Sequence, residues 1–334
     1  MTGVFSHPAF DDHERVLHWA DPASGLRAIV AIHRVRNGRA VGGCRARDFT
    51  SDDEALTDVL RLSRGMTYKT ALAGLPYGGA KAVILGRPTP EGLRAFGRAV
   101  DALGGTYVTA EDVGIGRTEL AVMKEETPWV LGADDVGGVA APFTALGVFH
   151  ALRGALRHAG TELPGLTVAV QGTGAVGSRL CALLRDAGAR LVVADVDAAS
   201  AAAVPGAQVV DPESIHAVDA DVLAPCALGG TLNERTIPEI RARIVAGAAN
   251  NQLATPEDDA RLAARGITYV PDFLASAGGV TNGVSELDGY DRADVEARIE
   301  RIAATAEAVL AEAQRRGIPS GAAAEALAME MATR

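Results

Sequence analysis

Two lysines, Lys69 and Lys81, stand on either side of a mostly apolar segment that contains the adjacent glycines Gly78 and Gly79. The ammonium form of a lysine is disfavoured beside apolar residues and a second cation, so a lysine in such a place can act as a general base. The glycines have no side chains and would let a small molecule approach the backbone next to Lys81. The pattern indicates proton transfer from a small molecule to a lysine. The alternative is a helix and a strand that carry two solvated lysines, because most lysines are exposed.

A carboxylate, Asp112, follows the short strand predicted over residues 107–110. A side chain at the end of a strand can reach a cleft, although an acid there more often caps a turn. Successive side chains of an extended chain point to opposite sides, so we expect only one of Glu111 and Asp112 to take part. We expect Lys69, Lys81 and Asp112 to converge.

A nucleotide-binding pattern occupies residues 172–177, which read Gly-Thr-Gly-Ala-Val-Gly and join an apolar strand to a helix. In a GxGxxG turn the glycines allow the tight turn, the approach of the pyrophosphate and the packing of the helix on the strand. The next strand ends in Asp195, where a carboxylate accepts hydrogen bonds from the ribose hydroxyls and repels a 2′-phosphate, which favours NAD over NADP. An ordinary βα turn is the alternative, and Arg179 and Arg190 argue against a strict preference for NAD. The expected cofactor contacts here are Gly172, Gly174, Ala175, Val176, Gly177 and Asp195.

The elements that carry these residues alternate between strands and helices, which predicts an α/β fold. Apolar runs predict strands over residues 14–21, 26–35 and 82–85, and a capping box at Ser51 predicts a helix that leads to Lys69. Beyond residue 140 the rhythm is strongly βαβ, which predicts a doubly wound Rossmann domain.

The glycine-rich stretch 134–142 predicts a domain boundary. We expect residues 1–140 to form a substrate-binding and oligomerisation domain, and residues 141–310 to form the NAD-binding Rossmann domain. Residues 311–334 should form a helix that returns to the first domain. A nucleotide domain preceded by an α/β domain of this size implies hydride transfer in an active-site cleft between the two.

The amino-acid composition argues against several classes of binding partner. The net charge of −10 argues against a nucleic acid or an anionic membrane surface, since both need basic patches. No apolar stretch is long enough to span a bilayer, and the first residues lack a signal-peptide core. The three cysteines have no paired spacing, which argues against a disulfide framework or a zinc site. We expect a cytoplasmic, reduced, soluble protein without a metal.

Six segments resemble the Glu/Leu/Phe/Val amino-acid dehydrogenase family, in the order in which that family has them. The resemblance is closest to the leucine/valine/phenylalanine branch. The matching segments are residues 65–69, 78–81, 107–114, 224–229, 245–252 and 277–280.

The resemblance implies reversible, NAD-dependent oxidative deamination of an L-amino acid to a 2-oxo acid and ammonia, by a homo-oligomer. It assigns Lys69 to the substrate carboxylate, Lys81 to the activation of the attacking water, and Asp112 to proton transfer at the amino group. Such roles fit the chemistry, because a carboxylate needs a fixed cation and the attacking water needs a base. The resemblance also assigns Gly42, Gly43 and Met66 to the substrate pocket, and Thr144, Cys226, Ala227 and Asn250 to the cofactor. Strand-end packing is the alternative role for Cys226 and Ala227.

Two residues depart from the family pattern. Ser276 replaces an asparagine that helps to hold the substrate carboxylate, and Ala80 replaces a glycine before Lys81. The matched segments contain no further lysine for a side-chain carboxylate, so we expect an apolar substrate of the leucine or valine type, with phenylalanine or another aromatic amino acid second. Ser276 also motivates a different class, a catalytically idle NAD-binding sensor.

Overall fold

The computed structural model describes residues 3–134 and 136–333, which form two compact units. The first unit comprises the described parts of Met1–Gly138, Gly283–Tyr290 and Ala328–Arg334, and the second comprises Val139–Asn282 and Asp291–Leu327. The chain thus passes from the first unit to the second at Gly138, two residues before the position expected from the sequence. The sequence did not indicate that the connector Gly283–Tyr290 belongs to the first unit.

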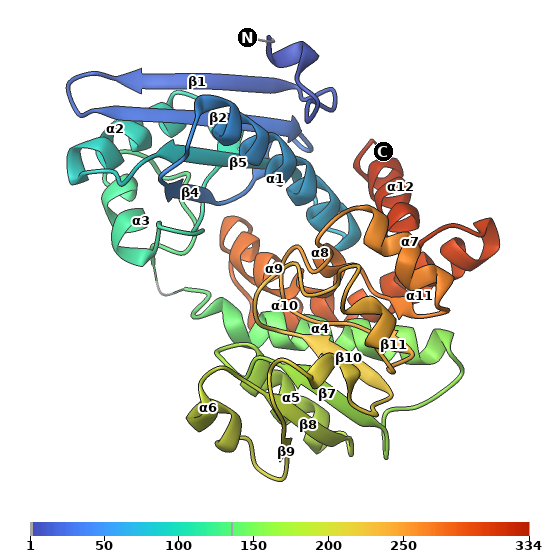
Figure 1. Ribbon diagram of the computed structural model, residues 1–334. Helices are drawn as coiled ribbons and strands as arrows, with labels where there is room; N and C mark the ends of the chain where they lie inside the picture. The colour runs from blue at the N-terminus through green and yellow to red at the C-terminus, as the bar shows by residue number, and fades with distance from the viewer. Residues whose placement is uncertain (1–2, 135, 334) are drawn as a thin grey trace. The chain divides into compact units, whose positions relative to one another are not determined.

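The first unit is built on a mixed sheet in which β2 pairs antiparallel with β1 and β5, while β3, β4 and β6 run parallel to their neighbours. The spatial order is β1-β2-β5-β3-β6, and β4 also pairs with β5. The strands are β1 (Arg15–Asp21), β2 (Leu26–Arg34), β3 (Ala40–Val41), β4 (Cys44–Arg47), β5 (Gly78–Leu85) and β6 (Tyr107–Val108) (Figure 1).

Helices cover both faces of this sheet, and the alternation of side chains along the strands decides which helix each residue meets. Ile29 and Val83 pack in a core with residues of α1 (Asp52–Leu72). Val30 and Ala82, one residue along, pack in a core with residues of α2 (Pro90–Asp101) and α3 (Arg117–Lys124). Lys81 has the same parity on β5 as Val83 and therefore faces α1.

The second unit contains a fully parallel sheet in the order β12-β11-β10-β7-β8-β9. This is the doubly wound arrangement of dinucleotide-binding domains, in which the direction of winding changes between β7 and β10. The predicted Rossmann domain is confirmed. Its strands are β7 (Thr167–Gln171), β8 (Arg190–Ala194), β9 (Gln208–Val209), β10 (Val222–Pro225), β11 (Ile244–Val245) and β12 (Thr268–Tyr269).

Helices α4 and α11 pack closely in the second unit. Gly154 of α4 permits this contact, since a Cβ there would overlap the Ala303 carbonyl of α11. Helices α9 and α12 each cross from one unit to the other along the chain. The remaining helices after α3 are α4 (Ala140–His158), α5 (Gly177–Asp186), α6 (Ala198–Ala202), α7 (Glu257–Ala264), α8 (Asp272–Ala275), α9 (Gly278–Val284), α10 (Arg292–Glu300), α11 (Ile302–Arg316) and α12 (Ser320–Ala332). Short 3₁₀ turns are η1 (Val4–Ser6), η2 (Ile215–Ala217), η3 (Ile237–Glu239) and η4 (Ser285–Leu287). Over the described ranges, no helix combines the length and apolarity that a membrane span needs.

Candidate active site and nucleotide site

Lys81 and Asp112 form an ion pair in the first unit. Lys81 lies on β5, and its Nζ donates a hydrogen bond to Asp112 Oδ2. The two side chains are only 8% and 14% exposed, so water screens the pair weakly. Asp112 reaches this place because the N–H groups of Gly42 and Cys44 donate backbone hydrogen bonds to the carbonyls of Val108 and Ala110, which hold the segment before Asp112. Two of the three polar residues expected to converge are therefore in contact.

The surroundings of Asp112 keep its carboxylate charged. Its Oδ1 accepts hydrogen bonds from Arg45 Nε at 3.1 Å and from the Val113 N–H at 2.5 Å. Burial raises the pKa of Asp112, but the positive charges of Lys81 and Arg45 lower it by more, so the pKa lies below its usual range. At neutral pH Asp112 is therefore a proton acceptor, and it can donate a proton only after it has taken one up. Glu111, the acid beside it, is exposed.

Gly42 and Gly43 let the connection from β3 to β4 pass close to the ion pair. A Cβ at Gly42 would overlap the Ala80 carbonyl oxygen, and a Cβ at Gly43 would overlap the Glu111 carbonyl oxygen. The buried Tyr107 hydroxyl donates a hydrogen bond of 2.9 Å to the Gly42 carbonyl and fixes this backbone further. The sequence did not single out Tyr107, because a buried aromatic residue in a strand carries no catalytic signal.

Met66 and Lys69 lie near the C-terminal end of α1. The helix approaches β5 closely at this point, since a Cβ at Gly79 would overlap the backbone nitrogen of Thr67. The Met66 side chain lies beside Gly42. Residues three apart share one face of a helix, so Lys69 extends from the α1 face that carries Met66. Lys69 is half-buried.

The glycines of residues 172–177 differ in what surrounds them. Gly172 follows β7 with a φ of +94°, which favours glycine, and Gly177 opens α5 where a Cβ would overlap the Gly172 carbonyl oxygen. Gly174 has open space in place of a side chain. Ala175 and Val176 complete the turn into α5. The loop therefore combines a tight turn, a close helix–strand contact and an open position, as a pyrophosphate site requires.

Asp195 follows β8 directly and contacts the glycine loop. Its carboxylate accepts hydrogen bonds from the Thr173 N–H at 2.6 Å and from the Asp197 N–H at 2.9 Å. The backbone N–H of Asp197 and then that of Thr173 hold the pKa of Asp195 below its usual range. The negative charge is thus fixed beside the glycine loop. Thr173, the variable position of the motif, was not predicted as a contact.

Cys226 and Ala227 follow β10, on the other side of the change in winding direction. Ala227 is exposed and lies next to Gly172, where it occupies the space that a Cβ on Gly172 would need. Cys226 lies next to Gly177, within contact distance of the place that a Cβ on Gly177 would take. Burial raises the pKa of the Cys226 thiol to about 12, so it remains protonated. The structure therefore brings both residues to the glycine loop, where they serve packing at least.

The remaining expected contacts lie on other loops and helices of the second unit. Asn250 is exposed after β11, and its carbonyl oxygen approaches Gly229. Thr144 Oγ1 donates to the Ala140 carbonyl at 3.1 Å within α4 and lies against Gly279 of α9. Among the described residues, no hydrogen bond joins Asn250 or Thr144 to the glycine loop.

Ser276 is buried between α8 and α9. Its hydroxyl donates a hydrogen bond of 2.7 Å to the Asp272 carbonyl, one turn earlier. Glycines follow because α9 begins against α4, where a Cβ at Gly278 would overlap the Phe143 carbonyl oxygen. Ser276 would have to release the Asp272 carbonyl before it could donate to a substrate carboxylate, as one hydroxyl carries one hydrogen.

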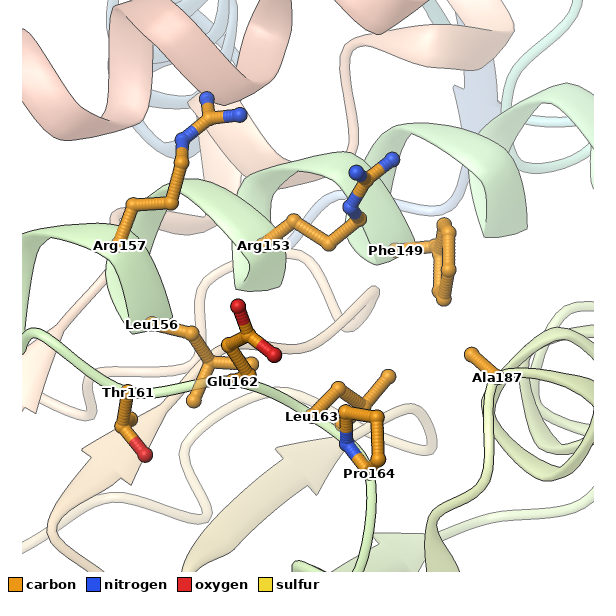
Figure 2. Close-up of a pocket in the computed structure, with 9 residues that line it drawn as sticks. All are labelled: Phe149, Arg153, Leu156, Arg157, Thr161, Glu162, Leu163, Pro164 and Ala187. Carbon is orange, nitrogen blue, oxygen red and sulfur yellow. The ribbon is translucent and has the colours of Figure 1, made fainter.

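A separate pocket of about 500 Å³ lies in the second unit, along α4 (Figure 2). Arg153 and Arg157 project from α4 among the residues that line it, and none of the residues predicted for the substrate or the cofactor lines this pocket. Within residues 3–134 and 136–333, no group of His, Cys, Asp and Glu side chains could hold a metal ion.

Comparison with known proteins places this geometry in a family. The sequence matches the Glu/Leu/Phe/Val dehydrogenase dimerisation domain over residues 13–129, and Glutamate/Leucine/Phenylalanine/Valine dehydrogenase over residues 139–203 and 193–333. A leucine dehydrogenase of Geobacillus stearothermophilus is 43% identical and a valine dehydrogenase of Streptomyces coelicolor is 42% identical. These matches cover 98% and 95% of this chain, and 92% and 91% of the relatives. The crystal structure of L-tryptophan dehydrogenase from Nostoc punctiforme superposes with a TM-score of 0.89 at 41% identity and 96% coverage of both chains. The chain therefore belongs to the Glu/Leu/Phe/Val dehydrogenase family, whose members are amino-acid dehydrogenases.

Proposed function

We propose that the protein catalyses the reversible, NAD-dependent oxidative deamination of an apolar L-amino acid of the leucine or valine type to its 2-oxo acid and ammonia. The observation that carries this proposal is the buried Lys81–Asp112 ion pair beside Gly42, in a chain that belongs to a family of amino-acid dehydrogenases. The leucine and valine dehydrogenases among its relatives support the substrate class.

In this proposal three side chains of the first unit divide the work. Lys69 holds the substrate carboxylate with its fixed positive charge. Asp112 accepts a proton from the substrate ammonium group, which leaves an amine that can release hydride from Cα. In its unprotonated amine form, Lys81 acts as the base for the water that attacks the imine carbon, and Asp112 returns its proton to the departing amine. Bound NAD supplies the hydride acceptor.

The second unit supplies the cofactor site in this proposal. The glycine loop offers an open position at Gly174 and the N-terminus of α5 for the pyrophosphate. Asp195 keeps a fixed negative charge beside the loop, which would repel the 2′-phosphate of NADP and attract ribose hydroxyls. We therefore propose NAD as the preferred cofactor, with Thr144, Cys226, Ala227 and Asn250 as further contacts.

Assembly and location follow as parts of the same proposal. The family description of residues 13–129 as a dimerisation domain supports a homo-oligomer formed through the first unit. The three cysteines are free thiols, which supports the reducing cytoplasm as the site of action.

An aromatic amino acid is the second candidate substrate, and the likeness to L-tryptophan dehydrogenase favours it. A substrate panel distinguishes the two. NADH formation is measured with leucine, valine, isoleucine, phenylalanine, tryptophan and glutamate. We expect the highest kcat/KM with a branched-chain amino acid and negligible turnover with glutamate. A preference for phenylalanine or tryptophan would replace the first candidate by the second.

A catalytically idle NAD-binding sensor is the alternative from another class, motivated by Ser276. NAD binding by calorimetry separates it from the enzyme. A sensor would bind NAD and turn over no amino acid in the panel, and Lys81→Ala would leave it unchanged in every assay. The Lys81–Asp112 ion pair argues for the enzyme, since a sensor needs no buried base.

A further inference from the structure

Arg45 lies between two carboxylates in the first unit. It belongs to β4, which runs parallel to β5 with Arg45 opposite Val83. Its Nε donates to Asp112 Oδ1 at 3.1 Å, and its Nη1 donates to both carboxylate oxygens of Asp58, at 3.1 and 3.3 Å. The side chains of Arg45, Asp58 and Asp112 are between 14% and 20% exposed, so water competes only weakly for these bonds.

The two oxygens of the Asp112 carboxylate accept hydrogen bonds from different donors. Oδ1 accepts from Arg45 and from the Val113 N–H, while Oδ2 accepts from Lys81 Nζ. A planar guanidinium restricts the rotation of a carboxylate more than a flexible ammonium does. With Oδ1 held, Oδ2 is the oxygen that faces Lys81. Asp58 holds the other edge of the guanidinium and belongs to the long helix α1.

We propose that Arg45 is a positioning residue for proton transfer: it fixes the Asp112 carboxylate so that Oδ2 faces Lys81, and Asp58 fixes Arg45 in turn. This inference rests on the function proposed above for Asp112. Arg45 itself contacts no reacting atom. It acts through the orientation of Asp112 and through the charge it places beside that carboxylate.

The charges around Asp112 make the inference measurable as a pH effect. Burial raises the pKa of Asp112, and the charges of Lys81 and Arg45 lower it by more. Cys44 and Tyr107 also face Asp112, and burial raises the pKa of both, so they stay uncharged. Loss of Arg45 removes one of the two cations and moves the pKa of Asp112 upward. Because Asp112 must be ionised to accept a proton, the acid-side midpoint of the kcat profile should move to higher pH.

The test compares Arg45→Met with Arg47→Met in the full-length protein. Arg47 is the matched control, because it lies two residues along β4 and pairs with Glu54 and Asp58 rather than with Asp112. For Arg45→Met we expect kcat to fall about 30-fold, since positioned proton transfer contributes roughly 10²–10⁴-fold. The KM values for the amino acid and NAD should stay within about threefold, and the acid-side midpoint should rise by about 1 pH unit. Arg47→Met should leave the midpoint unchanged and lower kcat by less than about twofold, because Arg45 keeps both of its hydrogen bonds to Asp58.

Arg45→Lys separates charge from orientation. It keeps a positive charge but loses the planar fork. We expect its acid-side midpoint to stay near that of the wild type, while kcat remains about tenfold reduced. A wild-type kcat and pH profile in Arg45→Met would overturn the inference, and so would equal losses in Arg45→Met and Arg47→Met.

If circular dichroism shows that Arg45→Met does not fold, Asp58→Asn tests the positioning role of Arg45 instead. The amide keeps the shape of Asp58 but weakens its hold on Arg45, so we expect a fall in kcat of about threefold with intact NAD binding. Wild-type kcat in both Asp58→Asn and Arg45→Lys would overturn the inference. Failure of the wild-type protein to turn over any amino acid would instead reject the proposed function, which keeps the two failures distinct.

Discussion

The candidate sites of the two units consist of different chemical groups. The site in the first unit consists of charged side chains that hold one another, with Lys81 and Arg45 on either side of Asp112. The site in the second unit consists mainly of backbone, with glycines that admit close approaches and one carboxylate, Asp195, held by N–H groups. Proton transfer needs side chains that gain and lose charge, whereas a pyrophosphate needs fixed amides and empty space. Substitutions should therefore damage chemistry in the first unit and cofactor affinity in the second.

The strongest test of this division is Lys81→Ala. We expect deamination to fall by at least about 10³-fold, because Lys81 is the proposed general base for the attacking water. The variant should fold, since Asp112 keeps Arg45 and the Val113 N–H as partners. NAD affinity, measured by calorimetry, should stay within about twofold of the wild type, as the glycine loop is untouched.

Lys124→Ala is the matched control for Lys81→Ala. Lys124 also forms an ion pair, with Asp134, but both side chains are more exposed. Its removal should change neither kcat nor NAD affinity. A parallel loss of catalysis and NAD affinity in Lys81→Ala would contradict the division between the two units.

Two glycine substitutions, one in each unit, separate an effect on NAD binding from an effect on stability. Gly174→Ala places a methyl group in open space, so the free energy of unfolding should stay within about 0.5 kcal/mol while the KM for NAD rises about tenfold or more. Gly79→Ala drives a Cβ into the Thr67 backbone, so the free energy of unfolding should fall by about 1–3 kcal/mol or more. Chemical denaturation and NAD titration together measure both effects.

Gly65→Ala is the control for the second of these changes. Gly65 lies in the same helix as Thr67 and has open space around it, so alanine should be neutral or stabilise by up to about 1 kcal/mol. If Gly79→Ala proved as stable as Gly65→Ala, the close approach of α1 to β5 would be wrong.

Cofactor choice should respond to Asp195. Asp195→Ser removes the carboxylate that we propose repels a 2′-phosphate. We expect the ratio of kcat/KM for NAD to that for NADP to fall about tenfold or more. Asp197→Ser is the control, because Asp197 caps the start of α6 and accepts from the Ala199 N–H. It should cost a little stability and leave the ratio unchanged. An unchanged ratio in Asp195→Ser would remove Asp195 from the cofactor site.

The smallest expected effect concerns Ser276. Ser276→Asn adds a second donor hydrogen and lengthens the side chain, and the present hydroxyl is engaged with the Asp272 carbonyl. We expect the KM for the amino acid to fall about two- to fivefold with little change in kcat, the effect of roughly one hydrogen bond. A rise in KM would indicate that the serine suits the substrate of this protein better than asparagine does.

Much of the fold could be predicted because its signals are local. The βαβ rhythm beyond residue 140 and the glycine turn after β7 each occupy a short stretch of chain, and the parallel sheet follows from them. Lys81 and Asp112 could be singled out by type and context, although they are 31 residues apart. The two-residue strand β3 and the short β4 could not be predicted, because Gly42 and Gly43 interrupt any alternation between them.

The supporting residues could not be predicted, because their roles exist only after folding. Arg45 is 67 residues from Asp112 and 13 residues from Asp58, and no local pattern joins the three. Tyr107 looks like any core aromatic residue until its hydroxyl meets the Gly42 carbonyl. Residues that pair across a sheet have no fixed separation in the sequence, so no local pattern identifies them.

In the proposed reaction, hydride passes from the Cα of an apolar L-amino acid to NAD. The most direct measurement uses L-leucine deuterated at Cα, with mass spectrometry of the cofactor after incubation with the wild-type protein. We expect NADH that carries one deuterium, formed together with the 2-oxo acid and ammonia over many turnovers. From Lys81→Ala we expect no more than about one equivalent per active site, because the proposed role of Lys81 follows hydride transfer. NAD that binds but stays oxidised, with every amino acid of the panel, would contradict it.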